Sequence, residues 1–250
     1  MDLARVTLVL DKVRHPDNLG STLRAMRNCG LSRLTLVDPQ TRDFERAKVM
    51  ATDAADLLHT LVEQPDLPAA VAHGTLVAGT TSRQPEGRRC LWLRDFARLA
   101  AEETARGGEV VVVFGNEQRG LSDAELDHCQ WVVNIPTSSE KSSINLAQSV
   151  MLVGYELFTA SFDVPAATPP EGEPANAGEL NALYARMREA LLDADFLNPH
   201  NPDAILSELK RLLERARPNR REAELLLNAF KHLQRAMHHG PRKRGPGAGN

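Results

Sequence analysis

Polar side chains and glycines that could hold a ligand gather in three segments of this 250-residue chain. Residues 18–30 (NLGSTLRAMRNCG) combine an amide and hydroxyls with the guanidinium of Arg24. Residues 114–121 (FGNEQRGL) place two glycines around a carboxylate, and residues 134–147 (NIPTSSEKSSINLA) are rich in serine and end near an amide. Together, such groups can position a reacting hydroxyl and stabilise the negative charge that develops on it.

The nucleotide-binding motifs of many α/β enzymes are absent. Residues 11–20 (DKVRHPDNLG) follow the first apolar run, and they hold neither the G-x-G-x-x-G turn of dinucleotide sites nor a G-x-x-x-x-G-K-[ST] phosphate loop. The glycines that would let a backbone approach a ligand, Gly115 and Gly120, lie late in the chain. No clustered His and Cys set occurs, so no metal site is expected. Three residues are interpreted as small, buried or half-buried hydrophobic side chains: Cys29, Cys90 and Cys129.

Short apolar runs alternate with longer segments of helical spacing in the first part of the chain. The runs are residues 6–10, 34–37, 76–78, 110–114 and 131–135. Continuous apolar runs are typical of strands buried on both faces, so the pattern predicts a parallel sheet with helices on both sides. Such sheets bind ligands beyond the carboxyl ends of their strands, where the three polar segments fall. Asn18 is expected to cap a helix that ends at Gly30, and another helix is expected from Asn145 to Phe158.

A second unit is predicted after a change in composition. Residues 163–178 hold four prolines and no sustained apolar pattern, which indicates a linker. Helical spacing follows over residues 179–192, 202–216 and 221–237. The expected organisation is an α/β domain (1–162), the linker, a small helical domain (179–239) and a disordered tail (240–250).

Composition and charge are ordinary overall but unevenly distributed. Hydrophobic residues make up 42% of the chain and charged residues 25%, which is typical of a soluble globular protein. The formal net charge of −3 combines an acidic first part with a basic second part, concentrated in residues 209–244. That region is either a solvated helix face or a surface that attracts a polyanion. No apolar run is long enough for a membrane span or an export signal, so a cytoplasmic location and no membrane partner are expected.

Taken together, the three polar segments resemble the signature motifs of the SPOUT-class RNA ribose 2'-O-methyltransferases. They match N-x-G-x-x-x-R-A-M, F-G-x-E-x-x-G-L and I-P-x(5)-S-S-x-N-x-A in order and spacing. The helical region, especially residues 195–196 and 209–218, resembles the C-terminal extension of the TrmJ type, which methylates the tRNA ribose at anticodon-loop position 32. The resemblance implies a deep trefoil knot in the C-terminal part of the α/β domain, S-adenosylmethionine as cofactor, tRNA rather than DNA as partner, and a homodimer.

The resemblance also implies roles for particular residues. The expected cofactor-binding residues are Thr80, Thr81, Ser82, Gly115, Glu117, Gly120, Ile135, Ser142, Ser143 and Ile144. The side chains expected around the reacting hydroxyl are those of Asn18, Arg24, Glu117, Ser143 and Asn145. The residues expected to contact tRNA are Lys210, Arg211, Arg215 and Arg217. From the residues alone, Glu117 and Asn145 could instead brace the loops, and residues 80–82 could be a plain turn at a strand end.

The chemistry that the resemblance implies is an in-line displacement by a ribose hydroxyl on a sulfonium methyl group. Proposals for the family make the arginine of the first motif the base, but a guanidinium has a pKa above about 12. We therefore expect Arg24 to hold the target phosphate or the developing alkoxide, with the proton leaving through a phosphate oxygen or water. Two alternatives stay open: a ribosomal RNA substrate, or a knotted RNA-binding module without catalytic activity.

Overall fold

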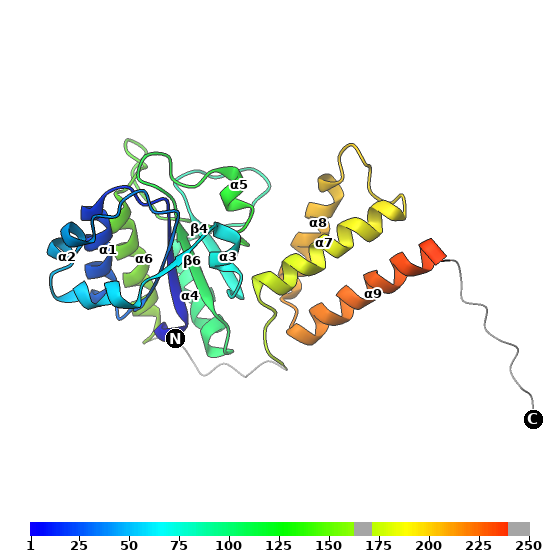
Figure 1. Ribbon diagram of the computed structural model, residues 1–250, viewed down its shortest axis with the longest axis horizontal. Coiled ribbons are helices and arrows are strands. Elements are labelled where there is room, and N and C mark those ends of the chain that lie inside the picture. The colour runs from blue at the N-terminus through cyan, green and yellow to red at the C-terminus, as the bar shows by residue number, and fades with distance from the viewer. Residues whose placement is uncertain (163–171, 240–250) are drawn as a thin grey trace, which may run out of the picture. The chain divides into compact units, whose positions relative to one another are not determined.

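The computed structural model describes residues 1–162 and 172–239 and divides into two units, Met1–Pro170 and Glu171–Asn250 (Figure 1). Each unit has a hydrophobic core of its own. The core of the first lies between a sheet and its helices, and the core of the second lies among three helices. The predicted division into an α/β part and a helical part is therefore reflected in how the side chains pack.

The first unit is built on a seven-stranded sheet in which every neighbouring pair is parallel. The strands are β1 (Val6–Asp11), β2 (Arg33–Val37), β3 (Val62–Gln64), β4 (Leu76–Thr80), β5 (Cys90–Trp92), β6 (Val110–Phe114) and β7 (Trp131–Asn134). Their order is β3-β2-β1-β6-β4-β7-β5, with Leu8 of β1 opposite Val112 of β6. Every residue of β1 and β6 is buried, as expected for the centre of a parallel sheet covered on both faces.

Helices cover both faces of the sheet. On one face, α1 (Pro16–Asn28), α2 (Phe44–Ala51), α4 (Leu93–Ala105) and α6 (Leu146–Ala160) share a core with Val110, Val112 and Phe114. Figure 1 shows α2, α1 and α6 side by side. Alternation along the strand turns Val111 and Val113 to the other face, where α3 (Leu67–Val71) and α5 (Asp123–Leu126) pack. Short 3₁₀ helices, Leu3–Arg5 and Thr52–Thr60, complete the unit.

Several predicted boundaries in this unit need correction. The edge strands β3 and β5 were not predicted, because each has three residues and no fully buried position. Cys90 lies on β5 and is exposed, so its assignment as a buried or half-buried residue was wrong. Asn18 does not cap α1: the helix begins at Pro16 with His15 as its N-cap, and Asn18 lies in the first turn. The end of α1 is as expected, with Gly30 at a φ of +69° directly after it.

The second unit consists of α7 (Ala177–Asp193), α8 (Asp203–Ala216) and α9 (Arg220–His239). Asn176 and Glu179 form a capping box at the start of α7, so the unit begins before residue 179 and the predicted linker ended too late. Residues 163–171 of the predicted linker and the predicted disordered tail lie outside the described part of the chain. Within residues 1–162 and 172–239, no helix combines the length and the apolar character that crossing a bilayer requires.

Candidate active site

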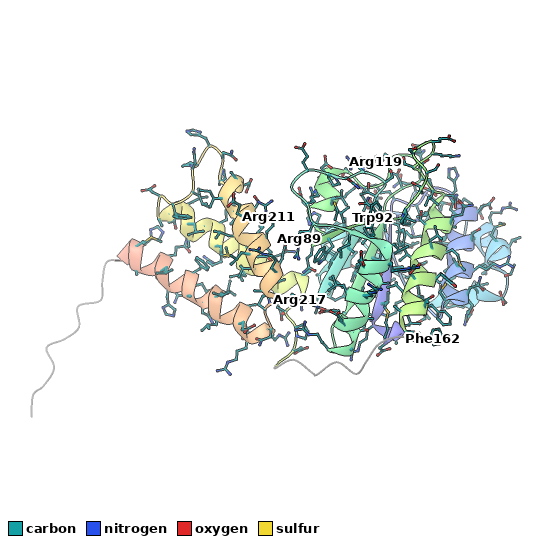
Figure 2. All side chains as sticks on the ribbon, turned by 180° about the vertical axis from the view of Figure 1, so that it is seen from behind. Arg89, Trp92, Arg119, Phe162, Arg211 and Arg217 are labelled. Carbon is teal, nitrogen blue, oxygen red and sulfur yellow. The ribbon has the colours of Figure 1, made fainter. Side chains whose placement is uncertain are left out.

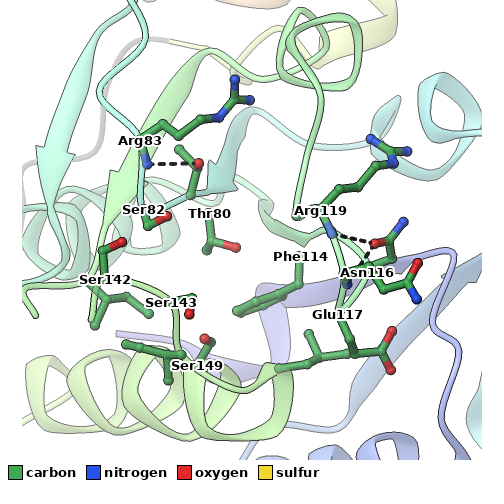
Figure 3. A pocket seen from close by; sticks show the side chains of 17 residues that line it. Thr80, Ser82, Arg83, Phe114, Asn116, Glu117, Arg119, Ser142, Ser143 and Ser149 are labelled. Carbon is green, nitrogen blue, oxygen red and sulfur yellow. Dashed lines mark hydrogen bonds between the residues drawn. The ribbon is translucent and has the colours of Figure 1, made fainter. Parts of the chain in front are cut away.

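Beyond the carboxyl ends of β4, β6 and β7 the chain encloses a cavity of about 280 Å³ (Figure 3). All ten residues that the sequence assigned to cofactor binding line it: Thr80, Thr81, Ser82, Gly115, Glu117, Gly120, Ile135, Ser142, Ser143 and Ile144. Figure 3 shows Ser142 and Ser143 across the cavity from Glu117 and Arg119. Three segments that are far apart in the sequence therefore form one cavity.

The two glycines of the loop after β6 have different structural roles. A Cβ atom on Gly115 would lie 2.1 Å from the carbonyl carbon of Gly120, so this position must be glycine because the loop closes on its own backbone. Gly120 has a φ of +68° with open space around its Cβ position, so it needs glycine for backbone conformation alone. The closure of the loop therefore already requires glycine at position 115, which also lines the cavity.

The loop before α6 offers main-chain groups that the protein does not use. Ile135, Ser142, Ser143 and Ile144 line the cavity. Within the described residues, none of the four makes a backbone–backbone hydrogen bond, and only the Ser142 carbonyl accepts a bond from a side chain, Thr137 Oγ1 at 3.5 Å. Ile135 and Ile144 are half-buried, whereas Ser142 and Ser143 are exposed. Main-chain groups that the protein leaves open in this way suit a ligand with both donor and acceptor edges.

Side chains from all three motifs join in one hydrogen-bonded network, the Glu117–Asn18–Asn145 network. Glu117 Oε1 accepts from Asn18 Nδ2 at 3.0 Å and from the backbone N–H of His15 at 3.1 Å, while Oε2 accepts from the N–H of Arg14 at 3.1 Å. Asn18 Oδ1 in turn accepts from Asn145 Nδ2 at 2.9 Å. Asn145 Oδ1 accepts from the first N–H groups of α6. The network ties the start of α1, the loop after β6 and the start of α6 together.

The same contacts set the ionisation of Glu117. Its partial burial opposes the charged form, but the hydrogen bonds from Asn18 and from backbone N–H groups outweigh burial and hold the pKa of Glu117 below its ordinary value. A carboxylate whose oxygens already accept three or more hydrogen bonds is a weak base. The geometry favours the bracing role for Glu117 and Asn145 that the sequence had left open.

Arg24 lies apart from the cavity. It is exposed on α1, does not line the cavity, and makes no hydrogen bond or ion pair with any residue in the described part of the chain. Six residues separate it from Asn18, which corresponds to about 9 Å along a helix axis. Of the five side chains predicted around the reacting hydroxyl, the structure brings together Asn18, Glu117, Ser143 and Asn145 and leaves Arg24 outside.

Several cavity residues were not singled out from the sequence: Arg83, Phe114, Asn116, Gln118, Arg119, Leu146 and Ser149. Asn116 Oδ1 accepts from the N–H groups of Gln118 and Arg119 at 3.0 Å each, which closes the loop into a turn. An Asn four residues before a Gly is a recognisable signal for such a turn. Thr80 and Thr81 act as turn residues as well as cavity wall, since Thr80 Oγ1 donates to the Val113 carbonyl and Thr81 Oγ1 accepts from the Arg83 N–H.

The four residues expected to contact RNA lie on α8 or directly after it, and Figure 2 labels Arg211 and Arg217 among them. Lys210 lays its ammonium over the ring of Tyr184, 5.4 Å from the centroid. Arg215 is exposed, and Arg217 caps the helix in the left-handed conformation with a φ of 50°. These cations therefore occupy the surface of a folded helical unit rather than an extended tail.

Comparison with known proteins adds to this geometry. Residues 5–155 match the SpoU rRNA Methylase family, and residues 178–242 match the C-terminal domain of the tRNA methyltransferase TrmJ. The first match covers more than half of the chain. This chain belongs to the SpoU methylase family.

Relatives of this SpoU protein align with it over nearly its whole length. A Pseudomonas aeruginosa protein named tRNA (cytidine/uridine/adenosine-2'-O-)-methyltransferase TrmJ is 33% identical, over 93% of this chain and 95% of its own. A Pectobacterium atrosepticum protein named tRNA (cytidine/uridine-2'-O-)-methyltransferase TrmJ is 32% identical, over 93% of this chain and 98% of its own. The crystal structure of TrmJ from Z. mobilis superposes with a TM-score of 0.76 at 27% identity, covering 91% of this chain and 98% of that one.

Proposed function

We propose that this SpoU-family chain methylates a ribose 2'-hydroxyl of tRNA with S-adenosylmethionine as methyl donor, at position 32 of the anticodon loop. The observation that carries the proposal is one cavity lined by the second and third motif segments, with Asn18 of the first segment hydrogen-bonded to Glu117 and Asn145 beside it. The relatives of this chain over nearly its whole length are named tRNA 2'-O-methyltransferases. We propose that this chain acts in the cytoplasm, where an enzyme that acts on tRNA would meet its substrate.

The cavity fits the methyl donor by the chemistry of its walls. The unpaired main-chain groups of Ile135, Ser142, Ser143 and Ile144 can pair with the donor and acceptor edges of an adenine. Thr80, Ser82 and Ser149 add hydroxyl-bearing side chains on the other walls. When bound, S-adenosylmethionine supplies a methyl group on a sulfonium centre whose neutral thioether product leaves without acid catalysis.

The chain's own task is then to hold the ribose and to stabilise charge on its oxygen. The Glu117–Asn18–Asn145 network fixes the loops, and the filled acceptors and lowered pKa of Glu117 make it a poor proton acceptor. A guanidinium stays protonated, so Arg24 serves to hold a phosphate or to stabilise the developing alkoxide. The proton leaves through a phosphate oxygen or water.

A homodimer would complete this site. Arg24 is absent from the cavity wall of its own protomer, so a second protomer that contributes this side chain would supply the missing cation. Leu152 and Tyr155 are 42% and 55% exposed on α6, which packs beside α1, and apolar side chains left bare there support such an interface. Light scattering tests the proposal, and a mass of one chain at micromolar concentration would contradict it.

The proposal also includes a trefoil knot in the C-terminal part of the α/β unit. Strand β7 follows β4 and β5 in the sequence yet lies between them in the sheet, so the chain returns into a gap that it had left open. The loop after β4, on one side of this gap, and the loop after β7 both line the cavity. Such a return is what a threaded C-terminal segment requires.

The decisive assay is transfer of tritiated methyl groups to purified RNA, followed by mapping of the modified nucleoside. The proposal expects incorporation into tRNA at position 32 and none into ribosomal RNA. The family's description names ribosomal RNA, so labelling of that RNA alone would assign the same chemistry to the other substrate. Calorimetry with S-adenosylmethionine separates both from a non-catalytic RNA-binding module, which need not bind the donor.

A further inference from the structure

Asn134, the last residue of β7, forms a second connection between cavity walls that the motifs do not include. Its side chain is buried, with 5% of the residue exposed, and it does not line the cavity. Asn134 Nδ2 donates to the Thr81 carbonyl at 2.6 Å and to the Arg83 carbonyl at 2.8 Å. The two N–H bonds of one amide nitrogen thus hold two carbonyls that lie two residues apart in the loop after β4.

Few side chains can make this contact. A primary amide carries two donors on one nitrogen, whereas an aspartate carboxylate has none and a hydroxyl has one. Without these donors, the carbonyls of Thr81 and Arg83 would have to find water or move apart. An aspartate at 134 would in addition place a carboxylate oxygen against two carbonyl oxygens, which repel it.

The effect of Asn134 extends to the opposite wall through Arg83. Its guanidinium donates from Nη2 to the Leu121 carbonyl at 2.7 Å, at the end of the loop after β6, and lies 3.2 Å from Asp123 Oδ1. The Arg83 N–H also donates to Thr81 Oγ1 at 3.2 Å, as the dashed line in Figure 3 marks. A chain of contacts therefore runs from β7 through the loop after β4 to the loop after β6.

We propose that Asn134 is a positioning residue for methyl-donor binding: by fixing the Thr81 and Arg83 carbonyls, it sets the separation of two cavity walls. The inference rests on the proposed function for the identity of the ligand. Where a ligand is recognised through main-chain groups, a displaced loop moves those groups with it and costs affinity directly. Asn134 is distinct from the Glu117–Asn18–Asn145 network, with which it shares no hydrogen bond in the described part of the chain.

The matched control lies at the other end of the same strand pair. Gln130 Oε1 accepts from the Val77 N–H of β4 at 3.0 Å, at the amino end of β7 and away from the cavity. Gln130→Ala therefore removes a side-chain amide contact between the same two segments of the sheet, with one hydrogen bond lost where Asn134→Ala loses two. A generic loss of stability would affect both variants, whereas the proposed role would affect only Asn134.

The experiment has two measurements on the full-length chain. Hydrogen–deuterium exchange of residues 80–84 without ligand reports the loop alone, and we expect exchange at least about tenfold faster in Asn134→Asp and Asn134→Ala, because an unmade buried hydrogen bond costs about this factor. Titration calorimetry with S-adenosylmethionine should show affinity weakened at least about tenfold in both variants. Under saturating donor we expect kcat to change much less than KM for the donor, and Gln130→Ala to keep wild-type affinity.

Each outcome has a distinct meaning. Wild-type exchange in the two Asn134 variants, or wild-type donor affinity despite faster exchange, overturns the positioning role while leaving the proposed function intact. Equal loss of affinity in Gln130→Ala overturns it too, since the effect would then follow stability. A wild-type chain that binds no S-adenosylmethionine overturns the proposed function, and with it the ligand assignment, even where the exchange result stands.

Discussion

Asp11 offers a test of electrostatics beneath the cavity because it is a buried carboxyl without adequate partners. It ends β1 with 1% of the residue exposed, and its Oδ1 has no hydrogen-bond partner within the described residues. Oδ2 lies 3.4 Å from Lys12 Nζ, which is 2.8 Å from Glu125 Oε1. Burial, and after it the nearby Glu125 carboxylate, raise the pKa of Asp11 to about 6, while Lys12 opposes the rise.

The sign and the size of the effect follow from linkage. The ordinary pKa of this carboxyl is 3.8, so in the unfolded chain it ionises at a lower pH than in the folded protein. The stability that the protonated form provides is complete below pH 3.8 and is lost as pH rises to about 6. A rise of about 2 in the pKa of Asp11 corresponds to about 3 kcal/mol in the free energy of unfolding, as an upper estimate. Glu125 has the opposite sign: hydrogen bonds from Arg119 and Lys12 outweigh its burial and lower its pKa, so its contribution is constant above about pH 5.

Asp11→Asn removes the titrating proton while keeping the side-chain shape. We expect the free energy of unfolding to rise at pH 8, by up to about 3 kcal/mol, and the gain to shrink toward zero near pH 4. Urea titrations followed by tryptophan fluorescence suit the measurement, because both tryptophans of the chain, Trp92 and Trp131, lie in the α/β unit. The signal is therefore specific to the unit that contains Asp11.

Asp17→Asn is the matched control. Asp17 is half exposed and pairs with Arg46 Nε at 2.6 Å, and this hydrogen bond lowers the pKa of Asp17. Its replacement should lower stability slightly or leave it unchanged, and should not raise it at pH 8. If Asp11→Asn is no more stable than wild type at pH 8, or if its gain does not depend on pH, the assignment of a strained, ionised Asp11 is wrong.

Three further predictions concern the cavity and its substrates. Gly115→Ala places a Cβ 2.1 Å from a backbone carbon and should abolish detectable S-adenosylmethionine binding in calorimetry. Gly120→Ala has nothing within 4 Å of its Cβ, costs about 1–2 kcal/mol of backbone strain and should keep donor affinity within a few-fold of wild type. Equal donor affinities in the two variants would refute the distinction. Arg24→Lys keeps the charge but loses the planar fork, so methyl transfer to tRNA should fall at least about tenfold, or about 1.4 kcal/mol of barrier, with donor binding unchanged; a fully active variant would remove Arg24 from the mechanism. Removal of residues 172–250 should weaken tRNA binding far more than donor binding, since the basic surface lies in that unit while the cavity lies in the other. Fluorescence anisotropy measures the tRNA affinity, and equal losses of tRNA and donor affinity would contradict this division of roles.

The central strands could be predicted from the sequence because the signal for each of them lies in consecutive residues. Val110–Phe114 is an unbroken apolar run, and a strand buried on both faces reads that way. The edge strands β3 and β5 carry no such signal, because each is paired on one side only and its side chains remain largely in solvent. They form because a neighbouring strand offers free backbone groups, which is a property of the assembled sheet.

Prediction of the site from the sequence is limited in the same way. Seven of the ten cofactor residues could be assigned because they lie in motifs that are visible along the chain, and residues 80–82 could be assigned because they follow a predicted strand. The partners of Asn18 could not be predicted, since Glu117 and Asn145 lie about a hundred residues away and meet it only after folding. Asn134 begins the third polar segment, but its role could not be predicted, because its partners are two backbone carbonyls and the sequence does not say which carbonyls a side chain will meet.

In a cavity that binds its ligand through main-chain groups, the substitutions that weaken binding most are expected at residues outside the cavity wall. Substituting Ser142 or Ile144 leaves the N–H and C=O groups of the loop in place, so moderate effects are expected there. Loop geometry depends instead on side chains that face the protein, such as Asn134 behind one wall and Asn145 at the start of α6. The strongest losses of donor affinity should therefore map to polar residues that hold the loops without lining the cavity. A scan in which cavity-lining hydroxyls dominate would contradict recognition through the backbone.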